Sequence, residues 1–599
     1  MFFTRIQVWK IVDSSAVRLY FCGSIFQVTR KPLNFRWIFR ESLDENAVQN
    51  LIKTLKIPKP IAKVLVGRGI STVDEVASYF TPDLALLHSP WLMDGMEVAV
   101  DRIMRAVELK EPIWIHGDYD VDGTSSTAIM LHFLRSIGAT ADYHIPNRMD
   151  EGFGFMPRSV DFAREFGAKV IITVDVGVTA AKTVEYAAGF GIDVIICDHH
   201  QAAEVLPSAL AILDPVKPGC TYPFQDLAAC GVTFKLIHAM CERRGTPDVA
   251  FRYLDLVAIA SAADIAPLHG ENRIISYFGL KLINENPRPG LKGLIECAGL
   301  HAGQITNSSV VFGLAPRINA AGRLGDPRRA VEMMITESEI QAFQIAQQLE
   351  HDNRLRRAID EETFELAEEQ ALQLLTDNPE MRSLVLHNAD WHAGVIGIVA
   401  SRLVERFHLP TVMLTTIDGI AKGSARSIKN FDIYAALKSC EDLMVEFGGH
   451  KHAAGLSLAA ENIPELRRRI DEVARKLLET VELSPEIQID AELSLSDLNP
   501  NFIKHLSRFA PFGYGNHRPM FFSKHVVSAN GVKVVGNNHL KFRALQSNFA
   551  IDAIGFNLGH KLDQCSHGKV FSMVYTLEEN TFNGSAMPQV RIKDIRPEQ

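Results

Sequence analysis

Short apolar runs alternate with longer amphipathic stretches between residues 113 and 215. The apolar runs are "PIWIHG", "ADYHIP", "KVIITVDVG", "IDVIICDHH" and "LAILDP", each bounded by Gly, Asp or Pro. Such runs are typical of strands that are buried on both faces of a sheet. The stretches between them, such as "TSSTAIMLHFLRSIG", have helical spacing. Repeated strand–helix–strand units imply right-handed crossovers and a parallel sheet, so the sequence predicts a doubly wound α/β domain here.

The pattern changes three times further along the chain. Residues 338–375 contain neither Gly nor Pro and are rich in Gln, Glu, Ala and Leu, which predicts one long helix joining two lobes, with the run "RLRRAID" as an exposed basic face. A second α/β unit follows, from "SLVLHNADW" to a helix near 463–480. After residue 484, short alternating strands such as "IQIDAEL" and "LKFRAL" predict a small β-barrel.

Composition describes a globular protein of several domains. With 599 residues and a mass of 66.5 kDa, the chain is too long for one core, and we expect three or four domains. Hydrophobic residues make up 47% and charged residues 22%, as in ordinary soluble proteins. The chain has no apolar run long enough for a membrane span. Its eight cysteines form no CxxC pair, which indicates reduced thiols and a cytoplasmic protein.

Charge is distributed unevenly. The net charge of −9 gives no overall sign of nucleic-acid binding, so any such binding must use a local basic region. The first forty residues carry seven basic residues and one acid, a composition similar to a transit peptide, but no small-residue cleavage site follows a compact apolar core. We therefore expect residues 1–35 to be a poorly ordered extension of unknown role.

Acidic residues follow the predicted strands. Asp118, Asp120 and Asp122 come after the first strand, and Asp175 ends "IITVD". The run Asp198-His199-His200 ends "VIICDHH", and a further acid, Asp264, ends the apolar helix "LDLVAIASAAD". One Asp after a strand is more often a helix cap. Since the carboxyl ends of parallel strands meet at one edge, where ligands bind, four such segments with His116 favour a shared site.

The chemistry of these side chains indicates hard divalent cations. Many carboxylates and few imidazoles suit Mn²⁺ or Mg²⁺ rather than structural zinc. This many ligands is enough for two ions about 3.5–4 Å apart, as in hydrolases that clamp both the attacking and the leaving oxygen of a phosphoryl group. Cations between the aspartates also explain why closely spaced like charges are tolerated.

Several motifs occur together in a family-specific order. "HGDYDVDG", "ITVDVG", "CDHH" and "ASAADIAPL" resemble the four motifs of the DHH phosphoesterase family. "PRINAAGRLGDP", "WHAGVIGIVASRL", "GGHKHAAGLSL" and "FAPFGYGNHRPMF" resemble its RecJ branch, the single-strand-specific 5′→3′ exonucleases of bacteria. The resemblance extends from about residue 36 to the end of the chain.

The resemblance implies an α/β fold with a particular division of the chain. A DHH catalytic domain with an N-terminal helical part would span 36–337, and a long helix at 338–378 would connect it to a DHHA1 α/β domain at 379–483. An OB-fold-like β-barrel that binds nucleic acid would span 484–599.

The resemblance also implies roles for individual residues. The metal ligands carry over to Asp120, Asp122, Asp175, His199 and Asp264, with His116 and Asp118 as further candidates, either as ligands or behind the ligands. His200 would lie beside the scissile phosphate, and Ser424 and Arg426 would hold the 5′-terminal phosphate. The implied reaction is metal-assisted hydrolysis.

Further contacts to DNA are expected in the same motifs. Guanidinium groups suit bidentate phosphate recognition, and Gly- or Ser-rich turns offer backbone N–H groups to the same anion. The candidates for phosphate contacts are Arg148, Arg317, Arg323, Ser424 and Arg426. His450 in the Gly-flanked "GGHKHAAG" turn is a candidate nucleic-acid contact, and the alternative is that these glycines only allow tight packing.

Three functions remain open from the sequence. The first is a two-metal exonuclease that degrades single-stranded DNA to 5′-mononucleotides in recombination and repair. By resemblance, a monomer would work with a single-strand-binding protein and a RecQ-type helicase. The second is a phosphodiesterase or pyrophosphatase for oligonucleotides or small phosphate compounds, although such relatives usually lack the barrel. The third is a non-catalytic, DNA-binding replication scaffold, although such relatives lose acids that are all present here.

Overall fold

The chain forms two compact units. The computed structural model describes residues 35–40, 44–147, 151–152, 154–479, 484–536, 538–582 and 585–598. One unit, here called the two-sheet unit, comprises Pro82–Leu483 and Ala510–His517. The other, here called the barrel unit, combines the described residues up to Thr81 with Ser484–Phe509 and the segment from Arg518 onward.

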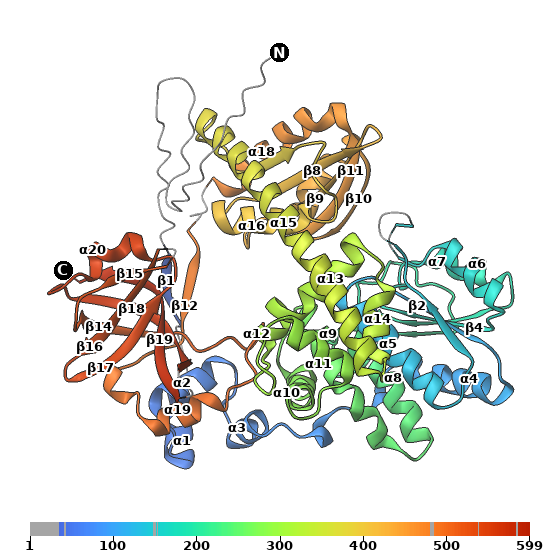
Figure 1. Ribbon diagram of the computed structural model, residues 1–599, viewed down its shortest axis with the longest axis horizontal. Helices are drawn as coiled ribbons and strands as arrows, with labels where there is room; N and C mark the ends of the chain where they lie inside the picture. Colours follow the sequence, from blue (N-terminus) through green and yellow to red (C-terminus); the bar gives the residue numbers. More distant parts are fainter. Residues whose placement is uncertain are drawn as a thin grey trace. The chain divides into compact units, whose positions relative to one another are not determined.

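The first sheet of the two-sheet unit is parallel and lies in a doubly wound arrangement, as the apolar runs predict (Figure 1). Its strand order is β3-β2-β4-β5-β6, with β2 (Ile113–Gly117), β3 (Ala141–His144), β4 (Val170–Val174), β5 (Asp193–Cys197) and β6 (Ala211–Leu213). The α/β prediction is therefore confirmed for all of the strands expected between residues 113 and 215.

Both faces of this sheet are covered. Ile113, Ile115 and Ile172 belong to a large core with helices on one face, whereas Trp114 and Ile171 belong to a second core on the other. The first core includes residues of α4 (Met96–Leu109), α5 (Val121–Ser136), α8 (Ala229–Arg243) and α9 (Leu254–Ala263). The second core includes residues of α6 (Pro157–Phe166) and α7 (Ala181–Ala188). Successive strand residues point to opposite faces, which accounts for the continuous apolar runs.

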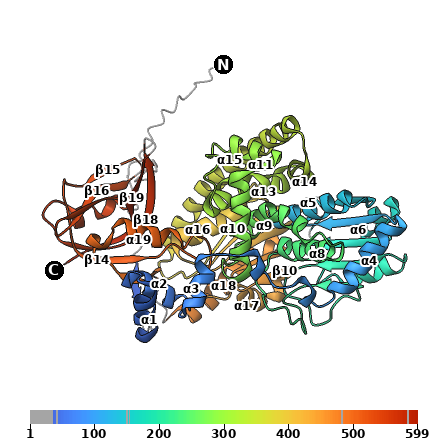
Figure 2. The same cartoon turned by 90° about the horizontal axis from the view of Figure 1, so that it is seen from below.

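The helical part of this unit continues the first core. It comprises α10 (Gly270–Glu285), α11 (Pro289–Cys297), α12 (Asn307–Ser309), α13 (Ala315–Leu324) and α14 (Arg328–Ile335). A one-turn π-helix, Val310–Leu314, leads directly into α13. Helices α8, α9 and α10 lie side by side (Figure 2), and α9 ends immediately before Asp264.

The predicted long helix is α15 (Glu339–Asp377), which begins at a cap by Ser338. One prediction for it is wrong: "RLRRAID" is not simply an exposed basic face. Arg356 is buried and donates a hydrogen bond of 2.8 Å to Asn353 Oδ1. Asp360, one turn further on, is paired with Arg402 of α16 (Ile396–Phe407) at 3.2 Å. This side of α15 therefore packs against α16, and part of the charge is used inside the protein.

The second sheet is mixed and has the order β10-β11-β9-β8-β7. Its strands are β7 (Leu384–His387), β8 (Thr411–Ile417), β9 (Ile420–Arg426), β10 (Met444–His450) and β11 (Ala453–Ala459). Only the β7–β8 pair is parallel. Helices α16, α17 (Ile433–Lys438) and α18 (Ile463–Leu478) complete this lobe, and α18 confirms the helix predicted near 463–480.

The barrel unit contains the predicted β-barrel. The strand order is β13-β14-β18-β19-β17-β16-β15, and a further β14–β16 pairing closes it. The strands are β13 (Ala491–Glu492), β14 (Phe521–Ser528), β15 (Lys533–Val535), β16 (His539–Gln546), β17 (Phe549–Gly555), β18 (Phe571–Phe582) and β19 (Ser585–Pro597). Helices α1 (Glu45–Leu55), α2 (Lys59–Gly67), α3 (Val73–Phe80), α19 (Pro500–Ser507) and α20 (Leu562–Cys565) belong to the same unit.

A short N-terminal strand pairs with a segment near the other end of the chain. The strand β1 (Arg36–Phe39) pairs in parallel with β12 (Glu486–Ile489), and the Trp37 indole donates a hydrogen bond of 2.7 Å to Asp594. Nothing in the four residues "RWIF" predicts this pairing. All of the described cysteines are free thiols, as expected. Within the described ranges, we find no helix with the length and apolar character needed to cross a membrane.

A buried ion pair connects the helical layer to the loop before α4. Lys235 of α8 and Glu271 of α10 are fully buried and 2.5 Å apart. Lys235 also donates to the carbonyl of His88, and Glu271 accepts from the His88 backbone N–H and the Tyr222 hydroxyl. The pair is therefore well hydrogen-bonded, but loss of one member would leave the other buried without its counter-charge.

We expect Lys235→Met to destabilise the two-sheet unit by about 3–5 kcal/mol, because Glu271 would be left buried without its cation. The measurement is urea-induced unfolding followed by circular dichroism. Lys292→Met is the matched control, since Lys292 and Glu339 form a solvent-exposed pair and its loss should leave the transition unchanged. Equal midpoints for the two variants would contradict the proposed importance of the buried pair.

Candidate metal centre

The carboxyl ends of the first sheet gather acidic side chains at one edge. Asp118 follows β2, Asp175 follows β4 directly, and Asp198 follows β5 directly. Asp264 comes from the end of α9. Asp214, which follows β6, is also fully buried and was missed by the sequence analysis, although its place after "LAIL" is the same signal.

The loop 118–122 is fixed by the start of α5. Asp120 is the N-cap of this helix, and its Oδ1 accepts hydrogen bonds from the N–H groups of Asp122 at 2.9 Å and Gly123 at 3.0 Å. A Cβ atom at Gly123 would lie 2.5 Å from the carbonyl oxygen of Asp118, so only glycine allows the loop to turn this tightly. Asp120 is therefore a helix cap, and its role as a metal ligand stays a prediction.

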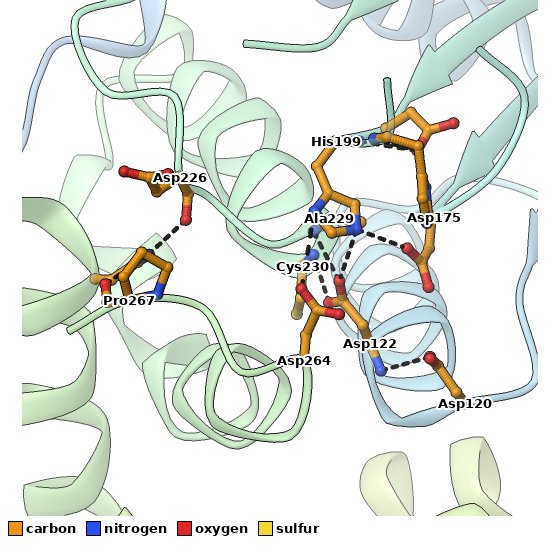
Figure 3. A network of polar contacts seen from close by, with 12 residues as sticks. Asp120, Asp122, Asp175, His199, Asp226, Ala229, Cys230, Asp264 and Pro267 are labelled. Carbon is orange, nitrogen blue, oxygen red and sulfur yellow. Dashed lines mark hydrogen bonds and ion pairs between the residues drawn. The ribbon is translucent and has the colours of Figure 1, made fainter. Parts of the chain in front are cut away.

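Asp122 lies at the start of a second helix. Its Oδ2 accepts from the N–H of Ala229 and its Oδ1 from the N–H of Cys230, both at 2.8 Å (Figure 3). These residues begin α8, whose N-terminus carries positive partial charge and favours an anion. The carboxylate is thus buried and oriented by backbone donors alone.

His199 lies among three carboxylates (Figure 3). Its Nε2 is 3.4 Å from Asp175 Oδ1 and 3.9 Å from Asp122 Oδ2, and its Nδ1 is 3.8 Å from Asp264 Oδ2. Segments from β4, β5, α5 and α9 therefore meet around one imidazole, as the sequence predicts.

The ligand atoms fall into overlapping groups, each with atoms within 4.8 Å of one another. Asp122, His199 and Asp264 form one group, and Asp118, Asp120 and Asp175 form another. Asp175 also forms a group with His199 and His200, so it connects the two sides. Oxygen-rich groups of this kind suit Mn²⁺ or Mg²⁺, and a shared carboxylate is what a two-ion centre needs.

The electrostatics fit a cation-binding site. Burial, followed by the charge of Asp264, raises the pKa of Asp122 to about 7. Burial and the charge of Asp120 likewise raise the pKa of Asp264 to about 7. Burial and the neighbouring carboxylates raise the pKa of Asp175 well above its usual range. Such mutual repulsion is relieved when divalent cations lie between the carboxylates.

Two of the ligand-bearing segments have strained backbone. Asp175 has φ of 67°, and Ile265, directly after Asp264, has φ of 60°. Non-glycine residues rarely adopt this region, and a β-branched residue is a marked outlier there. Strain of this kind persists only where the surroundings fix it, and it concentrates at functional sites.

Asp118 and His116, the two further candidates for metal binding, differ in their placement. Asp118 belongs to the group with Asp120 and Asp175. His116 is fully buried, its Nε2 lies 3.3 Å from the Gly154 carbonyl oxygen, and burial lowers its pKa to about 3. Among the described residues, no group of ligand atoms includes His116.

Asp198 orients His200, a role that the sequence analysis missed. The buried Asp198 accepts from His200 Nδ1 at 2.7 Å with Oδ1, and from the N–H of Val178 at 3.0 Å with Oδ2. Burial lowers the pKa of His200, but the hydrogen bond and charge of Asp198 outweigh it and raise the pKa to about 9. The half-exposed His200 side chain is therefore oriented beside the centre by a buried carboxylate.

The arginine candidates are placed differently from one another. Arg148 lies outside the described residues. Arg317 is buried and donates 2.6 Å hydrogen bonds to Glu350 of α15 and to the carbonyl of Gly313. Arg323 donates to the Gly394 carbonyl at 2.7 Å. The arginines of "PRINAAGR" thus make protein contacts, and a phosphate contact by either of them stays a prediction.

The remaining candidates come together on the second sheet. Arg426 donates to Ser424 Oγ at 2.9 Å on strand β9. The pKa of His450 is lowered by burial and then by the charges of His452, Arg426 and His200. In the sheet, His450 pairs with Ala453 of β11, and Ala453 pairs with Arg426 of β9.

Comparison with known protein families matches three parts of the chain. Residues 112–261 match the DHH family N-terminal domain, residues 380–476 the DHHA1 domain, and residues 489–594 the RecJ OB domain. The chain is 37% identical to the single-stranded-DNA-specific exonuclease RecJ of Bacillus subtilis, covering 93% of this chain and 70% of the relative. Identity to the Escherichia coli protein of the same name is 33%, covering 90% of this chain and 96% of the relative.

The chain belongs to the RecJ family. The crystal structure of RecJ from Thermus thermophilus in complex with Mn²⁺ superimposes with a TM-score of 0.81 at 28% identity, covering 94% of this chain and 80% of that chain. The Mg²⁺ complex of the same protein gives a TM-score of 0.75 at 27% identity, covering 94% of this chain and 79% of that chain. The fold predicted from the sequence is thus confirmed as that of the RecJ family.

We expect Asp198→Asn to lower kcat by about 10- to 100-fold, the value of one charge-assisted hydrogen bond, because His200 would lose the carboxylate that orients it. The measurement is steady-state hydrolysis of single-stranded DNA at saturating Mn²⁺. His200→Gln should have a similar effect, and the double variant should be no worse than His200→Gln, since Asp198 acts through His200. Additive losses would show that Asp198 acts independently of His200.

Proposed function

We propose that this protein is a divalent-metal-dependent exonuclease that hydrolyses single-stranded DNA from the 5′ end to 5′-mononucleotides, in recombination and DNA repair. The observation that carries the proposal is a set of neighbouring clusters of possible metal ligands. Asp175 belongs both to the cluster with Asp118 and Asp120 and to the cluster with His199 and His200. These clusters occur in a chain that matches two bacterial single-stranded-DNA-specific exonucleases over at least 90% of its length.

We assign the metal-holding role to the grouped side chains, Asp118, Asp120, Asp122, Asp175, His199 and Asp264. Bound divalent ions supply Lewis-acid chemistry, since they make water more acidic and neutralise charge on a phosphoryl group. The protein's own part is to hold the carboxylates in place through the starts of α5 and α8. His200 donates a charge-assisted hydrogen bond to a phosphate oxygen.

We assign the 5′-terminal phosphate to Ser424 and Arg426. A guanidinium beside a hydroxyl offers several donors to one phosphate group, and the two side chains are hydrogen-bonded to each other. The contacts of Arg323 with Gly394 and of Gly397 with Ser424 and Arg426 support a connection between the helices beside the centre and the end-binding residues. A strand held by its terminal phosphate would then present its first phosphodiester bond to the metals.

Two observations favour this function over the alternatives. The RecJ OB domain match at residues 489–594 supports a polymeric substrate, because OB folds bind single strands by stacking and backbone contacts. All of the acids expected for metal binding are present, which does not suit a non-catalytic scaffold. We further propose a cytoplasmic monomer that cooperates with a single-strand-binding protein and a RecQ-type helicase.

Chelation of metal is expected to abolish hydrolysis, and added Mn²⁺ or Mg²⁺ to restore it. Asp122→Ala should lower kcat by about 1,000-fold, as for the loss of a major electrostatic contribution. The measurement is release of label from 5′-labelled and 3′-labelled single strands and from blunt duplex. The 5′ label should appear as mononucleotide, and the duplex should survive.

The matched control is Asp161→Ala, a change at an aspartate of α6 that pairs with the surface residues Arg164 and Tyr186. Long strands that survive while dinucleotides are hydrolysed would favour a phosphodiesterase for small substrates. DNA binding without any cleavage would favour the scaffold.

A second prediction concerns the strand end. Arg426→Ala should raise KM for a 5′-phosphorylated strand by about 10- to 100-fold, the value of one to two charge-assisted hydrogen bonds. It should have little effect on a 5′-hydroxyl strand, because that strand lacks the group recognised. Arg468→Ala on the exposed face of α18 is the charge-matched control. Equal losses for both strands would argue against end recognition by Arg426.

A further inference from the structure

Helix α13 presents three contact residues on one face. Asn319, Gly322 and Arg323 are spaced at i, i+3 and i+4, so they lie along the same side of the helix. Asn319 and Gly322 contact the loop that bears the aspartates of the proposed centre. Arg323 contacts Gly394, ahead of α16 in the other lobe. A further contact attaches α13 to α15, through Arg317 and Glu350.

Asn319 fixes the loop that bears the metal-binding aspartates. Its side-chain oxygen accepts the backbone N–H of Val121 at 3.1 Å. Val121 is the first residue of α5, and its N–H is one of the donors that a helix start leaves without a partner in the helix. Asp120 takes the next two N–H groups. Asn319 therefore fixes the residue between Asp120 and Asp122, although it lies 198 positions away in sequence.

Gly322 brings the backbone of α13 against the same loop. A Cβ atom at this position would lie 2.7 Å from the Tyr119 carbonyl oxygen and 3.1 Å from the Tyr119 ring. Real Cβ atoms do not approach a carbonyl oxygen this closely, so the helix and the loop are in direct backbone contact. A shift of α13 would thus move the aspartate loop with it.

The next residue reaches the other lobe. Arg323 donates to the Gly394 carbonyl at 2.7 Å, and a Cβ atom at Gly394 would lie 3.2 Å from the Arg323 carbonyl oxygen. Three residues further on, a Cβ atom at Gly397 would lie 2.9 Å from Ser424 Oγ and 3.1 Å from Arg426 Nη2. Close contacts therefore run from Val121 through α13 and the start of α16 to Ser424 and Arg426.

We propose that Asn319 is a positioning residue that acts through α13 to fix the separation between the metal centre and the phosphate-binding pair Ser424 and Arg426, and that this separation sets the length of the product. The inference rests on the proposed exonuclease function. A strand carries one phosphate per nucleotide, so a fixed separation between its bound end and the metals selects one phosphodiester bond. A looser connection admits the next bond as well.

A purely local role for Asn319 makes a different prediction. If the side chain only completes the start of α5, its loss lowers stability and leaves the site of cleavage unchanged. Product length therefore separates positioning across the two lobes from local capping.

The experiment compares Asn319→Ala with wild type on a 5′-phosphorylated, 5′-labelled single strand at saturating Mn²⁺. We expect kcat to fall about 10-fold or more, because small misplacements of reacting groups are costly, and labelled dinucleotide to appear beside the mononucleotide. Asn319→Asp keeps an acceptor of the same shape for the Val121 N–H and should restore mononucleotide as the product. Mn²⁺ binding, followed by electron paramagnetic resonance without DNA, shows that each variant loads metal.

Asn499→Ala is the matched control, because Asn499 also caps a helix start, that of α19 in the barrel unit. It should release mononucleotide only. Should Asn319→Ala fail to fold, Asn319→Ser, which shortens the acceptor, gives the same comparison. Mononucleotide as the only product of Asn319→Ala or Asn319→Ser would overturn the positioning role and leave the exonuclease proposal intact. A wild-type protein that cleaves no single strand would overturn both.

Discussion

Repulsion among buried carboxylates is the constraint on which the two-sheet unit depends. Burial raises the pKa of Asp122, Asp175 and Asp264, and the charges of neighbouring carboxylates, Asp120 among them, raise each further. The fold offsets part of this cost with two helix starts, since α5 donates to Asp120 and α8 to Asp122. The remaining negative charge suits divalent ions, so the arrangement is complete only with its metals.

Carboxylates that repel each other do not hold a geometry by themselves, and the surrounding backbone has to do so. Gly123 and Gly322 allow contacts at which any side chain would collide with a carbonyl. Asp175 and Ile265 keep left-handed backbone that only a rigid environment maintains. The backbone near the acids thus has to be rigid, because the carboxylates repel one another. This requirement explains why the four segments that carry them pack so closely.

The sequence predicts the strands and the convergence of acids because both follow from local patterns. Apolar runs mark buried parallel strands, and the topology of such sheets brings Asp118, Asp175 and Asp198 to one edge. Contacts between distant segments follow no such pattern. The pairing of β1 with β12 joins residues 450 positions apart. Likewise, the sequence predicts an exposed Arg356, and its buried position on α15 follows only from the packing.

Bound metal ions explain how an acidic chain with a net charge of −9 can act on a polyanion. Part of the arginine charge near the centre is used in protein contacts, as for Arg317 and Glu350. Without ions, an approaching phosphate meets the clustered carboxylates of Asp118, Asp120, Asp122, Asp175 and Asp264 and is repelled. Two divalent ions would offset four of these five charges and so remove most of the repulsion that the phosphate meets. Metal binding therefore has to precede productive binding of the strand, and affinity and catalysis at this centre depend on the same ions.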